Sequence, residues 1–136
     1  MAQYRKHEDS HEKFLKDADD FCVFTIRMLK SEAICPKSAR WLGADEIIRI
    51  THRIHTQLHR ANNMKVTTRE EKNCRHAAQA DAYALLVTLG EKFTFCAKLY
   101  NVEVDKLSSW LTRKGKVQAW LSSWIRSDEN RYKNIG

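Results

Sequence analysis

Apolar residues recur along this chain at the three- and four-residue spacings that are typical of helices facing a core. Four stretches carry this pattern, and they predict helices over about residues 8–33, 42–62, 68–100 and 103–127. The 136 residues include only four glycines and one proline, fewer turn formers than a β-rich domain of this size needs. The pattern therefore predicts an all-α fold, with residues 1–136 forming a single domain.

Local signals set the expected ends of these helices. Pro36 disfavours helical geometry in the residue before it and so predicts a break between the first two helices. Thr68 and Glu71 have the spacing of a capping box at the start of the third helix. The residues from about Asp128 onward are polar and predict a frayed tail. Because short connections between long helices favour antiparallel neighbours, we predict an up-down-up-down antiparallel four-helix bundle.

The last predicted helix carries two apolar stripes, although a helix in a small bundle needs only one to reach the core. One stripe consists of Leu107, Leu111, Gly115, Gln118, Leu121 and Ile125. The other is rich in tryptophan and consists of Trp110, Val117, Trp120 and Trp124. The tryptophan stripe is either additional core or a docking face, so its four residues are our candidate interface with another subunit or a partner. Gly90 lies inside the third helix, where glycine costs about 1 kcal/mol relative to alanine, and predicts a close helix–helix approach.

The net charge of +7 is unevenly distributed. Residues 26–66 hold eight basic and three acidic side chains, whereas residues 1–25 hold four basic and six acidic ones. Charge concentrated in this way attracts polyanions and raises association rates. The simpler alternative is a solvated surface that only keeps the protein soluble.

Basic side chains gather before and along the second helix, and again on the fourth. Arginines one turn apart on a helix can contact successive phosphates, which gives affinity without base specificity. Few acidic residues lie four positions from these arginines, which disfavours, without excluding, a surface of intrahelical ion pairs. The candidate nucleic-acid-binding residues are Lys37, Arg40, Arg49, Arg53, Arg60, Arg113, Lys114, Lys116 and Arg126.

Three histidines of the second helix, His52, His55 and His59, share a helix face and resemble a metal site. A metal in a bundle typically also takes carboxylates with Glu-x-x-His spacing from facing helices, and the chain has no such pattern. Neighbouring arginines also disfavour a bound cation. We therefore expect no metal and no other cofactor.

The sequence carries no motif of an enzyme. The serines of the fourth helix lack the glycine elbow that presents a nucleophile, and no glycine-rich phosphate loop is present. The four cysteines form no Cys-x-x-Cys pair, and three of them lie on apolar or mixed helix faces, which predicts free thiols in a reducing cytoplasm. With no membrane-spanning stretch and no signal peptide in the sequence, we expect a non-enzymatic, cytoplasmic protein without membrane contact.

Several short motifs occur in a familiar order over roughly residues 10–127. They are Pro36-Lys37-Ser38-Ala39-Arg40-Trp41, Ala61-Asn62-Asn63, an alanine- and leucine-rich helix after Arg75, and Gly115 followed by Leu121-Ser122-Ser123-Trp124-Ile125. In these motifs and their order, the chain resembles the four-helix bundle family that includes the accessory variability determinant (Avd) of diversity-generating retroelements. The same family includes proteins encoded in intervening sequences of bacterial large-subunit ribosomal RNA genes. The chain departs from the family where many members have Gly-Gly and it has Ser122-Ser123.

The resemblance implies a non-enzymatic bundle that forms a ring-like homopentamer with a basic surface. In the retroelement branch it also implies binding to RNA, or to an RNA–DNA hybrid, and association with a reverse transcriptase. Our leading hypothesis is thus a nucleic-acid-binding accessory subunit of a retroelement reverse transcriptase. The alternative is a structural or protein-binding oligomer of the ribosomal intervening-sequence type.

Overall fold

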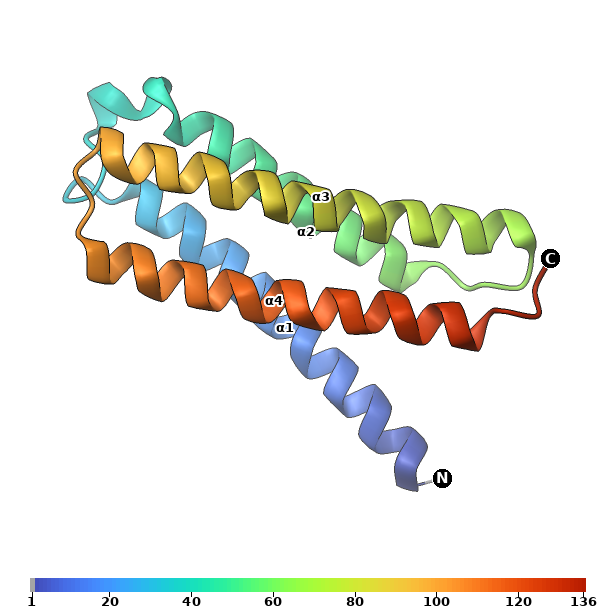
Figure 1. Cartoon of the computed structure of the whole chain (residues 1–136). Coiled ribbons are helices and arrows are strands. Elements are labelled where there is room, and N and C mark those ends of the chain that lie inside the picture. The colour runs from blue at the N-terminus through green and yellow to red at the C-terminus, as the bar shows by residue number, and fades with distance from the viewer. Residues whose placement is uncertain (1) are drawn as a thin grey trace.

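The computed structural model describes the backbone of residues 2–136 and the side chains from Ser10 onward. Four long α-helices and one short 3-10 helix account for most of this part of the chain (Figure 1). They are α1 (Ala2–Lys30), the 3-10 helix η1 (Lys37–Leu42), α2 (Ala44–Asn63), α3 (Arg69–Leu99) and α4 (Val104–Arg131). No strand occurs among the described residues. The prediction of an all-α fold is confirmed.

The helices form a bundle in which each long helix packs on its neighbours in the chain. The α2–α3 contact is the most extensive, α1 packs on α2, and α4 packs on both α3 and α1. In Figure 1 the first turns of α1 extend beyond the other long helices. None of the helices in the described part of the chain has the length and apolar character needed to cross a bilayer.

Two of the predicted helix ends agree well with the structure. Thr68 caps α3, and its hydroxyl oxygen accepts a hydrogen bond from the Glu71 backbone N–H, completing the predicted capping box. Hydrogen bonds to the Glu71 carboxylate, first from Thr67 and then from Thr68, hold the pKa of that carboxyl below its usual range. The break before Pro36 is also present, although α1 already ends at Lys30 rather than at residue 33.

The tryptophan stripe of α4 faces the core. Trp110 is fully buried and stacks on Phe93 of α3 with a ring separation of 3.8 Å, while Val117, Trp120 and Trp124 are at most 9% exposed. The indole N–H of Trp110 donates to the Thr25 hydroxyl oxygen of α1 over 2.8 Å. Within the single chain these residues are therefore core residues, the first of the two alternatives, and their role as an interface with another subunit or a partner stays a prediction.

The other stripe of α4 lies at the edge of the core, where Leu107 and Ile125 are partly buried against it. Leu111 is exposed, and a side chain at Gly115 would meet no atom within 4 Å. Only Leu121 of this stripe is fully buried. The tryptophan stripe thus fills the space between α1, α3 and α4 with its larger side chains, and the other stripe covers the edge of the core.

The prediction of a frayed tail from about Asp128 onward is wrong for Asp128 itself. Asp128 is buried, and α4 continues to Arg131 because that carboxylate is held by side chains of α3. Gly90 does mark a close approach, since a Cβ there would lie 2.9 Å from the Lys114 Cε of α4. The contact is made by a lysine side chain rather than by the backbone of the neighbouring helix.

Candidate nucleic-acid interface and polar clusters

The predicted basic residues of α2 lie in one row on its exposed face. Arg49, Arg53 and Arg60, which we call the α2 arginine row, fall within an arc of about 40° and span roughly 16 Å along the helix. All three are exposed. Arg53 lies 3.3 Å from Asp81 of α3, whereas no ion pair among the described residues involves Arg49 or Arg60. Two of the three arginines are therefore exposed and have no acidic partner in the described part of the chain.

The two predicted residues before α2 differ in their availability. Lys37 is exposed on η1. Arg40 folds back onto the end of α1, where its Nη2 donates to the Lys30 carbonyl oxygen over 2.5 Å and lies 3.7 Å from a Glu32 carboxylate oxygen. Its side chain is only 19% exposed. Arg40 thus closes the α1 C-terminus, and the prediction that it contacts phosphate is not favoured by this geometry.

The basic residues predicted on α4 do not form a surface. Their positions in the sequence spread Arg113, Lys114, Lys116 and Arg126 around the helix in four directions. The guanidinium of Arg113 lies 4.1 Å from the centre of the Phe24 ring, and Lys114 donates to the Gln118 side-chain oxygen over 2.6 Å. Lys116 and Arg126 are exposed. The structure brings the α2 residues together and leaves the α4 residues apart.

A groove between α1 and α4 places acidic groups beside two of these α4 residues. It has a volume of about 650 Å³, and its charged lining consists of Arg113 and Lys116 from α4 and Asp17 and Asp20 from α1. Apolar side chains, two of them from the tryptophan stripe, line most of the rest. Acidic groups that line the same groove reduce the positive potential that a phosphate would meet there. This face is therefore a weaker candidate for nucleic acid than α2.

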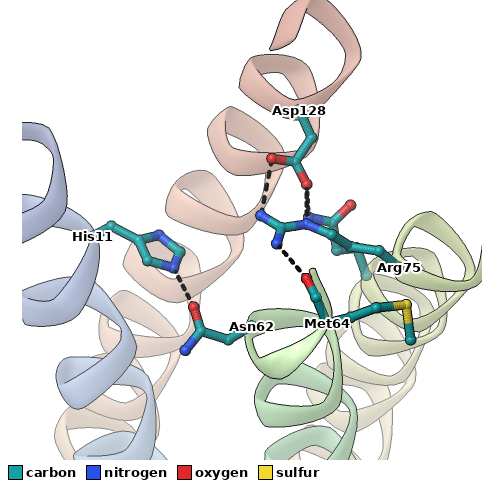
Figure 2. A network of polar contacts seen from close by, with 6 residues as sticks. His11, Asn62, Met64, Arg75 and Asp128 are labelled. Carbon is teal, nitrogen blue, oxygen red and sulfur yellow. Dashed lines mark hydrogen bonds and ion pairs between the residues drawn. The ribbon is translucent and has the colours of Figure 1, made fainter. Parts of the chain in front are cut away.

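The most completely buried charges lie where α2, α3 and α4 meet, and sequence reasoning missed them. The Arg75 guanidinium of α3 donates to both carboxylate oxygens of Asp128, over 2.6 and 3.1 Å, and to the Met64 carbonyl oxygen over 3.2 Å (Figure 2). Gln79 donates to the same carboxylate over 2.7 Å, and the Arg75 guanidinium also lies 5.2 Å from the Trp124 ring centre. We call Arg75, Asp128 and Gln79 the Arg75 network. Breaking a buried, paired charge of this kind is costly, so the network holds the helices together.

Nearby, an α1 histidine joins the same end of the bundle. His11 Nε2 lies 2.8 Å from the Asn62 side-chain oxygen of α2, as Figure 2 shows. The His11 ring centre lies 4.7 Å from that of Trp124. This contact fixes α1 against α2 and α4.

A second polar cluster lies between α1 and α2. The Asp19 carboxylate of α1 lies 2.8 Å from His59 Nε2 and 3.4 Å from His55 Nε2. The three residues, here the Asp19–histidine cluster, have ligand atoms that all lie within 4.8 Å of one another. His52 is not part of it. The sequence showed the histidines, but the carboxylate comes from a residue 40 positions away and does not follow the Glu-x-x-His pattern.

The cysteines are free thiols, as predicted. Cys22, Cys35 and Cys96 are buried, and Cys74 is exposed. Burial, and to a smaller extent the negative charge of Asp19, raise the pKa of the Cys22 thiol to about 12. Cys22 is therefore protonated at neutral pH, and it does not supply a thiolate to the Asp19–histidine cluster next to it in α1.

No protein-family model matches the chain, and neither a curated protein nor a solved structure matches it. The chemistry of the chain's own residues is therefore the basis for a functional proposal. Three features of the structure provide this basis: the α2 arginine row, the Asp19–histidine cluster, and the apolar side chains left exposed near one end of the bundle.

Proposed function

We propose that this protein is a non-catalytic nucleic-acid-binding protein that contacts the phosphate backbone through the α2 arginine row. The proposal includes the arrangement of the domain as an up-down-up-down antiparallel four-helix bundle. The sequence of helix contacts and the alternating directions of successive long helices in Figure 1 support that arrangement. In such a bundle α2 has one face in the core and the opposite face free for a ligand.

The observation that carries the proposal is the alignment of Arg49, Arg53 and Arg60 on one exposed face. Guanidinium groups are always charged and pair with phosphate oxygens through several N–H donors. Arg49 and Arg60 have no acidic partner among the described residues, so a phosphate does not have to displace one. Three such contacts contribute a slope of about −2 to −3 to the dependence of log K on log salt concentration, through counterion release.

The resemblance to the Avd family extends this proposal to a partner. On that basis the protein is an accessory subunit of a diversity-generating retroelement reverse transcriptase. It binds the template RNA or the RNA–DNA hybrid, and it assembles as a homopentamer. Light scattering of the purified protein, with and without a structured RNA, tests this assembly. A pentamer-sized particle that binds RNA only at low salt is the expected result, and a monomer that ignores RNA contradicts it.

The binding surface is tested with a fluorescently labelled RNA hairpin, an RNA–DNA hybrid of the same sequence, and anisotropy over a series of salt concentrations. The variant is Arg49→Glu with Arg60→Glu, which leaves the Arg53–Asp81 ion pair in place. We expect at least a tenfold loss of affinity at low salt and a salt slope that is shallower by about 2. Unchanged affinity would show that the α2 arginine row is not the binding surface.

The matched control reverses the same amount of charge on α4. Lys116→Glu with Arg126→Glu changes two exposed residues that point in different directions. Because both double variants lower the net charge equally, a purely nonspecific attraction predicts equal losses. A clearly smaller loss for the α4 variant localises binding to α2.

A second function is favoured by a different observation, the exposed apolar side chains near the η1 end of the bundle. Trp41 is 74% exposed, Phe95 63% and Val104 76%. A structural or protein-binding oligomer of the ribosomal intervening-sequence type uses such side chains as contacts. Its association persists or strengthens in high salt, whereas phosphate binding weakens, so sedimentation in low and high salt separates the two functions.

A further inference from the structure

We propose that Asp19, His55 and His59 form a binding site for a divalent transition-metal ion of the zinc type, which joins α1 to α2. This inference does not depend on the proposed nucleic-acid function. It rests on the donor atoms, their separations and the helices that position them.

The ligand geometry is close to what one tetrahedral ion requires. With bonds of about 2.0–2.1 Å, neighbouring ligand atoms of a zinc ion lie about 3.3 Å apart. The Asp19 oxygen lies 2.8 Å from His59 Nε2 and 3.4 Å from His55 Nε2, and the two imidazole rings are 4.5 Å apart between centres. Small rotations of the exposed side chains bring all three donors to one point.

The backbone holds these donors in register. His55 and His59 are four residues apart, so α2 presents both rings on one face, a spacing that zinc-binding helices use. Asp19 is presented by α1, which packs directly on α2. The contact of His59 with both carboxylate oxygens, at 2.8 and 2.9 Å, keeps the carboxylate in place before an ion binds. Nε2 of a neutral His59 binds the ion when the ring carries its proton on Nδ1 instead of on Nε2.

The donor set selects the kind of ion. Two imidazoles and one carboxylate suit zinc and its neighbours in the transition series, whereas magnesium and calcium prefer oxygen ligands alone. The side chains of Asp19, His55 and His59 are 32%, 48% and 33% exposed, so an ion can enter from solvent and keep at least one water ligand. The exposed charges next to the cluster in sequence have opposite signs, since Arg60 opposes a cation and Asp20 attracts one, and solvent screens both.

The test is a zinc titration of untagged, chelator-treated full-length protein by calorimetry, together with thermal unfolding and the visible spectrum of the cobalt-substituted protein. We expect one zinc per chain at this site, a cobalt spectrum of tetrahedral intensity, and a rise in Tm of several degrees at a zinc concentration about 100 times the Kd. Absence of saturable zinc binding overturns the proposal.

Substitutions distinguish an ion shared by two helices from adventitious binding to a helical histidine pair. Asp19→Asn keeps the size of the side chain, and it should weaken zinc binding by at least about tenfold and remove the Tm rise. His59→Gln should do the same. If Asp19→Asn binds zinc as tightly as the unaltered protein, then α1 contributes nothing and the proposal fails.

The matched control is His52→Gln, which removes an exposed histidine of the same helix from outside the cluster. We expect it to keep the affinity and the Tm rise, and a loss equal to that of Asp19→Asn indicates nonspecific surface binding instead. Far-UV circular dichroism and cooperative unfolding without zinc show whether each variant is folded. Should Asp19→Asn not fold, His55→Gln, which alters a half-exposed side chain, gives the decisive measurement.

Discussion

Two regions of this protein use arginine in opposite ways. In the Arg75 network, the Arg75 side chain is 9% exposed, and its guanidinium donates to Asp128 and to the Met64 carbonyl oxygen. On the outer face of α2, Arg49 and Arg60 are exposed and lie in no ion pair among the described residues. The chain thus uses one arginine to hold three helices together and leaves others free to meet a ligand.

The difference shows why net charge by itself does not locate a binding surface. Arg75 and Arg40 add to the charge of +7, yet both side chains fold onto groups of their own chain, Arg75 onto Asp128 and Arg40 onto the Lys30 carbonyl oxygen. The α4 residues are dispersed or packed on neutral side chains. What distinguishes the α2 arginine row is that its charges are aligned and that two of the three lack a partner within the described chain.

The largest effect is expected from breaking the Arg75 network. Asp128→Ala leaves the buried Arg75 guanidinium without its anion and Gln79 without its acceptor, so we expect the free energy of unfolding to fall by about 3–5 kcal/mol. Urea denaturation followed by circular dichroism measures it. A loss below about 1 kcal/mol would mean that the network is no more important than a surface ion pair.

A double substitution sharpens the interpretation of that result. Arg75→Met with Asp128→Leu removes both charges and replaces them with apolar groups. Because an unpaired buried charge accounts for much of the cost, we expect the double variant to be more stable than Asp128→Ala. A double variant that is less stable than Asp128→Ala would show that the pair contributes strongly through its own attraction.

A smaller effect is expected where a neutral buried contact is broken. Thr25→Val keeps the shape of the side chain but removes the oxygen that accepts the Trp110 indole N–H, which should cost about 1–3 kcal/mol. Thr51→Val is the matched control, because the hydroxyl of this buried threonine bonds only the Ile47 carbonyl oxygen of its own helix. Equal losses for both variants, measured in the same denaturation assay, would show that the Trp110 contact adds nothing specific.

The smallest change in the free energy of unfolding is expected from substitutions in the α2 arginine row. Arg49→Gln with Arg60→Gln should change the free energy of unfolding by no more than about 0.5 kcal/mol, because neither side chain makes an ion pair in the described chain. Thermal unfolding at two protein concentrations checks this. A clear destabilisation, especially one that depends on concentration, would mean that these arginines form contacts within an assembly and would break the comparison between the two regions.

The helices were predictable because the spacing of apolar residues and the Thr68–Glu71 capping box are local properties of the sequence. The orientation of α4 was not. Spacing shows which residues share a helix face. It does not show which of two apolar stripes packs inward, because that depends on the neighbouring helices. In the structure the tryptophan stripe packs inward, where Trp110 stacks on Phe93 of α3.

The polar clusters escaped prediction for the same reason. Asp128 looks like part of a polar tail until Arg75, 53 residues earlier, is placed beside it. Asp19 meets His59 across 40 residues of sequence. The α2 arginine row, in contrast, could be predicted because its members share one helix, and helical periodicity places them. Residues brought together by one element can be found from sequence, whereas those brought together by packing need the fold.

The burial of the tryptophans divides the intrinsic fluorescence of the protein into two signals. Trp110, Trp120 and Trp124 lie in the core, whereas Trp41 on η1 is 74% exposed. A soluble quencher should therefore reach Trp41 and spare the other three. In a Trp41→Phe variant the remaining emission comes from the core alone, and in the unaltered protein the quenchable fraction reports when the η1 end of the bundle is covered by another molecule.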